Sequence, residues 1–198
     1  MPVEVSEESR IIDAAYRCLA QSNGEGVSMT DILSAAGLST RAFYRHFESK
    51  DALLLAMFRR DSDRLHAELD AAARSTASPP EALRAWIEGY LRLTALPRRR
   101  QRVLMLSSAE LLSATGYAEA RAQTMRRLQE HIAGILRQGQ ADGSFPWTDP
   151  EPDAQAIRAT LTEAFAERMS GSARTSAATA AAQVTDFAFR ALGARGRR

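Results

Sequence analysis

Apolar residues along this chain recur with the spacing of amphipathic helices and not with the alternation of β-strands. In the first such stretch they follow an i, i+3, i+4, i+7, i+8 pattern, at Ile11, Ala14, Ala15, Cys18 and Leu19. Ser6 precedes this stretch as a predicted N-cap, and Glu7 and Glu8 have the sign that a helix N-terminus favours. Because the same periodicity returns over most of the chain, the sequence predicts an all-α protein.

Two short helices are predicted after the first one. Ser28 and Asp31 have the S-x-x-D spacing of a capping box, which places a helix start at this point, and Gly37 ends that helix. Ser39 is the predicted N-cap of the next helix, which closes at Phe47. Three short helices therefore precede the longer ones.

Longer helical segments fill the rest of the chain. They are Lys50 to about Arg74, Glu81 to Leu96, Tyr117 to Gln138, Ala154 to Met169, and a last helix that holds Val184, Phe187, Ala188 and Ala191. The segment VLMLSSAELL is more uniformly apolar and indicates a buried helix. The arginines between 98 and 102 precede it, and we expect a solvated helix entrance there and not a second nucleic-acid site.

The second and third helices have the pattern of a helix-turn-helix. The connection AAGLS has small residues for close packing and a glycine for the turn, and the second helix of such a motif lies in the DNA major groove. Ala42, Phe43 and Phe47 are the predicted inward set. The predicted outward set is Thr40, Arg41, Tyr44 and Arg45, with His46 at the rim. Arginine can bind guanine bidentately, threonine can contact a base edge, and the other three types suit phosphates.

Lys50 carries a positive charge at a position where a helix disfavours one. Ser49 is the predicted N-cap of the long helix, so Lys50, the only lysine of the chain, lies in the first turn. The helix dipole disfavours a cation there. A DNA phosphate bound at this terminus would pair with Lys50 and explain the charge. The alternative is an internal carboxylate, in which case Lys50 would serve the fold.

Composition narrows the class of protein. The 198 residues are 45% hydrophobic and 25% charged, which is typical of a folded globular protein. No apolar run approaches the roughly 18 residues of a membrane span, and the acidic N-terminus is unlike a signal peptide, so we expect a cytoplasmic protein. The single cysteine, Cys18, excludes an intramolecular disulfide and a multi-cysteine metal site, and we expect it in the core. The net charge is only +2, so a surface that binds nucleic acid would have to come from local clustering of basic side chains.

The stretch VSMTDILSAAGLSTRAFYRHFESKDALLLAMF, after a helix with an acidic start, resembles the DNA-binding domain of the TetR family of bacterial transcriptional regulators. The resemblance covers about the first third of the chain, and the combination G-L-S-x-x-x-F-Y-x-H-F-x-x-K is more specific than a general helix-turn-helix. It implies that Thr40, Arg41, Tyr44, His46 and Lys50 contact DNA, and that Thr30 and Ser39 contact phosphates.

The same resemblance implies an architecture and an assembly. Residues 1–49 would form the helix-turn-helix domain, and a long helix would lead into an effector-binding and dimerisation domain at 50–198. A homodimer would bind a palindromic operator in double-stranded DNA, and a small-molecule effector would release it. We expect the dimer interface on Ala154 to Met169 and Val184 to Leu192, through the apolar rows of Ile157, Leu161, Phe165 and Phe187.

The effector cannot be identified from the resemblance, but a set of residues could line an apolar pocket. Aromatic, soft and hydroxyl side chains of this kind occur at Trp86, Tyr90, Met105, Ser108, Met125 and Phe165. Each of them could equally belong to a plain core. The alternative function is therefore a helical DNA-binding protein without an effector.

Enzymatic functions are not supported by any motif in the sequence. His46, His66 and His131 lack metal-ligand spacing, and the chain has no G-x-S-x-G, P-loop or Rossmann glycine pattern. We therefore expect no catalysis, no metal and no cofactor.

Overall fold

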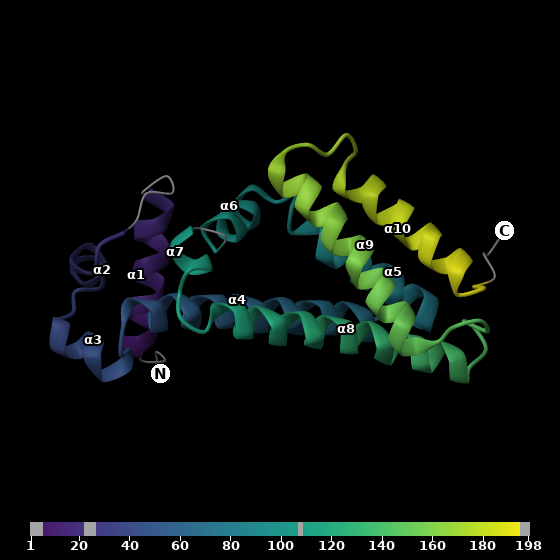
Figure 1. The fold of residues 1–198 in the computed structure, drawn as a ribbon, viewed down its shortest axis with the longest axis horizontal. Helices are drawn as coiled ribbons and strands as arrows, with labels where there is room; N and C mark the ends of the chain where they lie inside the picture. Colours follow the sequence, from purple (N-terminus) through teal and green to yellow (C-terminus); the bar gives the residue numbers. More distant parts are fainter. Residues whose placement is uncertain (1–5, 22–26, 107–108, 195–198) are drawn as a thin grey trace. The chain divides into compact units, whose positions relative to one another are not determined.

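The structure, a computed structural model, describes residues 6–21, 27–106 and 109–194. Within these ranges all regular secondary structure is helical, which confirms the all-α prediction. Figure 1 labels the helices, which are α1 (Glu7–Gln21), α2 (Met29–Ala36), α3 (Thr40–His46), α4 (Lys50–Arg74), α5 (Pro79–Arg92), α6 (Pro97–Met105), α7 (Ala109–Leu112), α8 (Tyr117–Ala141), α9 (Pro150–Ser170) and α10 (Ala177–Ala191). In the described ranges, none of these helices is both long and apolar enough to cross a membrane.

The chain folds into two compact units. The N-terminal unit comprises the described residues of 1–61 and 101–121, and the C-terminal unit comprises those of 62–100 and 122–198. The boundary expected at residue 49 therefore differs from the division by compactness. The reason is that Leu53, Leu54 and Met57, at the start of α4, are buried in the same core as α1 and α3.

The N-terminal unit is built around the face that α1 turns inward. Ile11, Ala14 and Ala15 are fully buried, as the periodicity predicted, and Cys18 packs partly buried against the same core. The Tyr16 hydroxyl donates a hydrogen bond of 3.0 Å to the backbone oxygen of Met57, which ties α1 to α4. Burial raises the pKa of Tyr16, so this hydroxyl keeps its proton at neutral pH.

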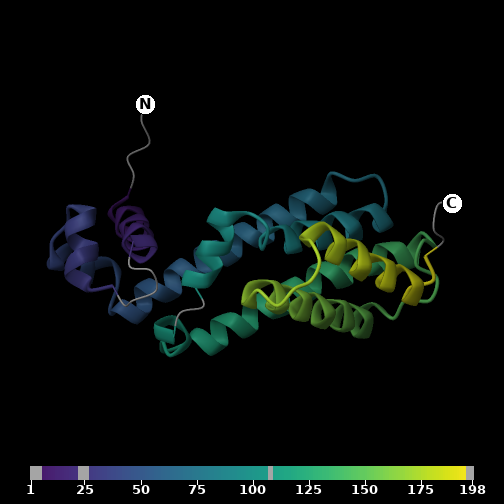
Figure 2. The same ribbon diagram turned by 90° about the horizontal axis from the view of Figure 1, so that it is seen from above.

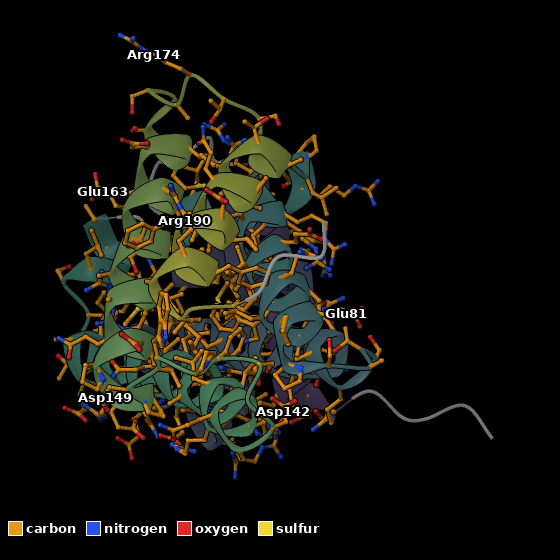
Figure 3. All side chains as sticks on the ribbon, turned by 90° about the vertical axis from the view of Figure 1, so that its right-hand side faces the viewer. Glu81, Asp142, Asp149, Glu163, Arg174 and Arg190 are labelled. Atoms are coloured by element: carbon orange, nitrogen blue, oxygen red, sulfur yellow. The ribbon has the colours of Figure 1, made fainter. Side chains whose placement is uncertain are left out.

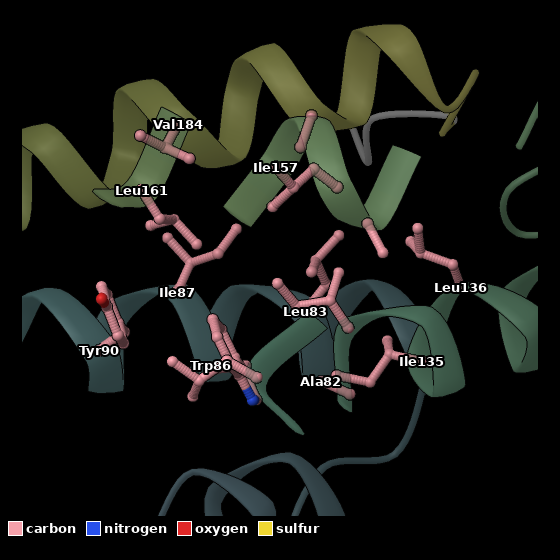
Figure 4. Packing of buried hydrophobic residues seen from close by; sticks show 14 of the residues in the cluster. Ala82, Leu83, Trp86, Ile87, Tyr90, Ile135, Leu136, Ile157, Leu161 and Val184 are labelled. Atoms are coloured by element: carbon pink, nitrogen blue, oxygen red, sulfur yellow. The ribbon is translucent and has the colours of Figure 1, made fainter. Parts of the chain in front are cut away.

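The C-terminal unit is built around α5. In the views of Figures 1 and 2, α10 lies along both α5 and α9. Figure 4 shows Leu83, Ile87 and Leu161 meeting between these helices. The Trp86 and Tyr90 rings stack with a centroid distance of 5.7 Å, and each adds a large buried area to this core.

Three helices begin earlier than predicted because their first turns contain proline or small residues. Pro79 starts α5 and Pro150 starts α9, and proline is well tolerated in a first turn because its missing N–H would have no helical partner. The alanine-rich stretch before Val184 forms the first turns of α10. Ser176 caps it by accepting a hydrogen bond of 3.0 Å from the Thr179 N–H.

Most of the residues predicted for the dimer interface are packed into the core of their own protomer. Ile157 and Leu161 are 3% and 1% exposed and belong to the core of their own unit, and Phe165 packs against that core. Val184 on α10 is also buried there. Of the predicted apolar rows only Phe187, at 49% exposure, points outward. Periodicity identified an apolar face on each helix, but that face packs within the protomer.

The prediction of one buried helix in VLMLSSAELL is also wrong. This segment contributes to α6 and α7 separately, and no single helix face can therefore be buried along it. Leu111 is 1% exposed, whereas Leu104 and Leu112 are 45% and 54% exposed.

Two of the four arginines between 98 and 102, Arg99 and Arg102, form ion pairs and are not merely solvated. Arg99 pairs with Glu68 at 2.5 and 3.1 Å. Arg102 pairs with Asp61 at 2.9 Å and lies 3.8 Å above the Tyr16 ring centroid. These contacts stabilise each unit from within and pair two of the four guanidinium charges of this segment with carboxylates.

Candidate nucleic-acid interface

Local hydrogen bonds that the sequence predicted hold the start of α2, the turn after it and the start of α3. Ser28 accepts a hydrogen bond of 3.1 Å from the Asp31 N–H, and its hydroxyl donates one of 2.6 Å to the Asp31 carboxylate. Gly37 has φ 63°, a left-handed conformation that glycine adopts without strain. Ser39 then caps α3 by accepting a hydrogen bond of 3.2 Å from the Ala42 N–H. The angle between the two helices is therefore set by the local sequence.

Two arginines of α1, for which the sequence pattern predicted no role, reinforce the connection between α2 and α3. Arg10 donates a hydrogen bond of 2.8 Å to the Ala36 oxygen, and Arg17 donates one of 2.9 Å to the Ala35 oxygen. These carbonyls end α2 and lack helical partners, so a cation is favourable there. The seven-residue spacing of the two arginines on one face of α1 was the available signal.

The two faces of α3 are separated as predicted. Ala42, Phe43 and Phe47 are at most 5% exposed and belong to the N-terminal unit's core or line it. The remaining predicted contact residues are exposed, namely Thr30, Ser39, Thr40, Arg41, Tyr44, Arg45 and His46. Tyr44 is 61% exposed, and Arg41 has no ion pair within the part of the chain that the structure describes. Arg41 is therefore free to bind an external group.

Arg45 and His46 share a carboxylate of α1. The guanidinium nitrogen of Arg45 lies 2.8 Å from Glu7 Oε2, and the His46 Nε2 atom lies 3.0 Å from the same oxygen. The hydrogen bond with His46 and the charge of Arg45 hold the pKa of Glu7 below its usual range. Glu7 thus connects the end of α3 to α1. It would compete with a DNA phosphate for the side chains of Arg45 and His46.

Lys50 has internal partners. Its ammonium group donates a hydrogen bond to the Val27 oxygen and lies 2.5 Å from Glu110 Oε1. The internal carboxylate that was the alternative explanation for Lys50 is therefore present, on α7. The ion pair with Glu110 accounts for a positive charge in the first turn of α4 without a bound phosphate.

Sequence comparison identifies the family of the N-terminal domain. Residues 11–57 match the family of bacterial regulatory proteins of the tetR type. Residues 11–57 therefore form a DNA-binding domain of the TetR type. The matched range contains α2, α3 and every residue named above on their exposed faces.

Two curated relatives each align with less than half of this chain. An uncharacterized HTH-type transcriptional regulator of Mycobacterium tuberculosis is 36% identical over 84 residues, which are 42% of each protein. An HTH-type transcriptional repressor of the same species is 36% identical over 58 residues, 29% of this chain and 31% of the relative. The chain thus spans less than half the length of the relatives it matches.

A likeness in fold extends over nearly the whole chain. The fatty acid degradation regulator FadR from Bacillus halodurans superposes with a TM-score of 0.75, covering 98% of this chain and all of that one. The identity is 18%, so the likeness concerns the fold alone. The two-part architecture of helix-turn-helix and helical C-terminal domain is thereby confirmed.

The C-terminal unit brings together part of the predicted effector set. Tyr90 packs between Trp86 and Phe165, with a centroid distance of 5.3 Å to Phe165, and Met125 packs against the same core. The Met105 side chain and Ser108 lie outside the described residues. In the described part of the chain, no cluster of three or more histidine, cysteine or carboxylate side chains could hold a metal ion.

Proposed function

We propose that this chain is a DNA-binding transcriptional regulator of the TetR family that represses from a palindromic operator as a dimer and is released by a small-molecule effector. One observation supports this most strongly. The face of α3 that includes Thr40, Arg41 and Tyr44 is exposed, while Phe43 and Phe47 fix the opposite face in the core. A helix fixed in this way can enter the major groove without losing its packing. The repressor named among the relatives agrees with the direction of regulation.

The exposed residues have distinct roles in this account. Arg41 reads guanine through two hydrogen bonds, and Thr40 contacts a neighbouring base edge. Phosphate contacts, which set position but not sequence, come from Thr30, Ser39, Tyr44, Arg45, His46 and Lys50. Arg45 and His46 reach phosphates only by exchanging Glu7 for them, and Lys50 by exchanging Glu110.

The experiment that tests the function is selection from a library of random duplexes by the purified full chain. We expect enrichment of an inverted repeat whose half-sites are separated by about one helical turn, 34 to 36 Å, or a multiple of it. A chain that retains duplexes without enriching any sequence would be a non-specific binder. A chain that retains none would not be a DNA-binding regulator.

The outward faces of α9 and α10 are the proposed dimer interface, replacing the rows that face inward. Figure 3 shows these two helices from outside, with Glu163 and Arg190 at the surface. Small side chains are exposed along both helices, at Ala156, Ala159, Ala166, Ala178 and Ala182. Small residues let two helix pairs approach closely across a two-fold axis, and Phe187 is the large apolar group on this face.

Phe187→Glu is expected to weaken the dimer at least tenfold, because a buried interfacial aromatic is replaced by a charge. Sedimentation velocity over a concentration series measures the change. Leu112→Glu is the matched control, since Leu112 is similarly exposed, at 54%, but lies on α7. A wild-type chain that stays monomeric at micromolar concentration would contradict the proposed assembly, as would a variant that dimerises normally.

An effector bound in the C-terminal unit can influence DNA binding through helices shared by the two units. Residues of α4 and of α8 belong to each unit, so these helices are continuous between them. A ligand shifts the equilibrium only by its difference in affinity between two conformations. A thermal-shift screen followed by operator binding tests this step. If no compound changes operator affinity, a DNA binder without an effector becomes the better account.

Glu110→Gln is expected to raise DNA affinity about twofold to fivefold, because it removes the carboxylate that competes with phosphate for Lys50. Lys50→Ala is expected to weaken binding to operator and random DNA alike, and to reduce the slope of log affinity against log salt by about one unit per half-site. Fluorescence anisotropy titrations at several salt concentrations give both quantities.

The double variant tests whether Glu110 acts through Lys50. In a Lys50→Ala background, Glu110→Gln should leave DNA affinity almost unchanged, because the competing pair is already absent. An equal gain in both backgrounds would show that Glu110 acts only by general repulsion of DNA. A Lys50→Ala variant with unchanged salt slope would remove Lys50 from the phosphate contacts.

A further inference from the structure

The C-terminal unit contains buried polar atoms with no partner. His66 is 2% exposed, and neither of its ring nitrogens has a hydrogen-bond partner among the described residues. Trp86 is 1% exposed, and in the same described ranges its indole N–H is also unpaired. Buried polar groups are almost always hydrogen-bonded, and leaving one unpaired is costly. Thr185 Oγ1, on α10, is a third side chain of this unit with an unpaired buried atom in the described ranges. His66 and Trp86 are the two with unpaired ring nitrogens, and they require an explanation.

The two side chains belong to one region of this unit. Leu69, one turn after His66 on α4, lies in the same core cluster as Trp86 and as Leu128 and Ile132 of α8. The His66 ring meets His131, the α8 residue next to Ile132, at a centroid distance of 5.5 Å. In Figure 4 the indole nitrogen of Trp86 points away from Leu161 and Val184, which belong to α9 and α10. The unpaired atoms of His66 and Trp86 are thus on the side of the core formed by α4, α5 and α8, whereas Thr185 lies on α10.

The protonation state of His66 determines which hydrogen bonds its ring can make to a ligand. Burial lowers the pKa of His66 to about 4, helped by the positive charge of Arg127 and by His131. The ring is therefore neutral at pH 7 and presents one N–H donor and one acceptor nitrogen. Trp86 adds a second donor. Arg127 is ion-paired with Asp63, so it is not available to neutralise a bound anion.

We infer that His66 and Trp86 are the polar anchors of the effector site, and that the effector is a neutral, mostly apolar compound with a hydrogen-bond-accepting oxygen. The stacked rings of Trp86 and Tyr90 provide the apolar contact, and the unpaired donors provide orientation and selectivity. This rests on the proposed function, since it names the chemistry of the effector that the proposed regulator senses.

The first test uses the ligand-free protein. A buried polar group that is unpaired until a ligand binds lowers the stability of the ligand-free protein. His66→Leu should therefore leave the melting temperature at pH 8 unchanged or raise it. A histidine whose nitrogens are satisfied by buried water would behave in the opposite way. A fall of more than about 4 °C, the size expected for loss of a buried hydrogen bond in a chain of this length, would overturn the assignment of His66.

The second test compares two probes of similar shape by calorimetry, acetophenone with its carbonyl oxygen and cumene without it. In Trp86→Phe the ratio of acetophenone to cumene affinity should fall about threefold to tenfold from its wild-type value, because only the indole donor is lost. Trp147→Phe is the control, since Trp147 is the other tryptophan of the chain and is 73% exposed. An unchanged ratio in Trp86→Phe, or no binding of either probe at millimolar concentration, would overturn the inference.

Neither test contains DNA, so the two proposals can fail separately. A chain that discriminates the probes through Trp86 but selects no operator loses the proposed function and keeps its ligand site. A chain that selects an operator but shows no dependence on Trp86 or His66 remains a regulator, and its effector chemistry must then differ from that inferred.

Discussion

Phe43→Ala is expected to reduce the free energy of unfolding of the N-terminal unit by about 3 to 5 kcal/mol. The Phe43 side chain is 0% exposed, and its ring lies 5.4 Å from that of Tyr44 and 5.5 Å from that of Phe47, measured between centroids. Truncation would leave a cavity under α3 and remove the support on which its exposed face depends. Urea unfolding followed by circular dichroism measures the change.

Tyr44→Ala is the matched control, because it removes an aromatic ring of similar size from the next position of the same helix. Tyr44 is 61% exposed, so its loss should change the free energy of unfolding by less than about 0.5 kcal/mol while weakening DNA binding. Equal destabilisation by the two substitutions would show that α3 does not have one buried and one exposed face.

The second large effect concerns pH. His66 has a folded-state pKa of about 4, against an ordinary value of 6.5, because burial disfavours its charged form. Between these values the unfolded chain binds a proton that the folded chain does not. The contribution of the neutral His66 to the free energy of unfolding is therefore fully present above pH 6.5. It is lost as the pH falls towards 4, because protonation then favours the unfolded chain. The loss attributable to this one group is about 3 kcal/mol.

Urea unfolding at pH 7.0 and pH 4.5, in wild type and His66→Leu, isolates this contribution. Other groups also contribute near the lower pH, since Glu7 begins to bind a proton there in the unfolded chain while its lowered pKa keeps it ionised in the folded chain. Only the difference between the two proteins therefore reports on His66. We expect His66→Leu to lose markedly less stability than wild type over this interval. Parallel losses in the two proteins would mean that His66 becomes protonated in the folded state near its ordinary pKa.

The features that sequence predicted best are local ones. Ser28, Gly37 and Ser39 act through hydrogen bonds to residues within five positions along the chain, and the inward set on α3 follows from helical periodicity. These interactions depend on spacing alone, which a sequence displays directly. The capping pattern and the faces of the helix-turn-helix were therefore predictable without coordinates.

The features that sequence missed depend on which distant segments meet. Glu7 is 38 residues from Arg45, and nothing in the local pattern connects them. The same is true of Glu110 and Lys50, which α7 brings together. On α9, periodicity marked the apolar row of Ile157 and Leu161 but not whether that row meets its own protomer or a second copy. Burial of Leu161 at 1% exposure in the single chain answers that question for this row.

The central claim is that Arg41 on the exposed face of α3 reads base sequence, and competition binding of Arg41→Ala tests it most directly. The assay compares affinity for the selected operator with affinity for a scrambled duplex of equal length. We expect Arg41→Ala to lose about 1 to 3 kcal/mol on the operator and little on the scrambled duplex, so that discrimination falls mainly at one base position in each half-site. Equal losses on both duplexes, or no loss on either, would contradict the account.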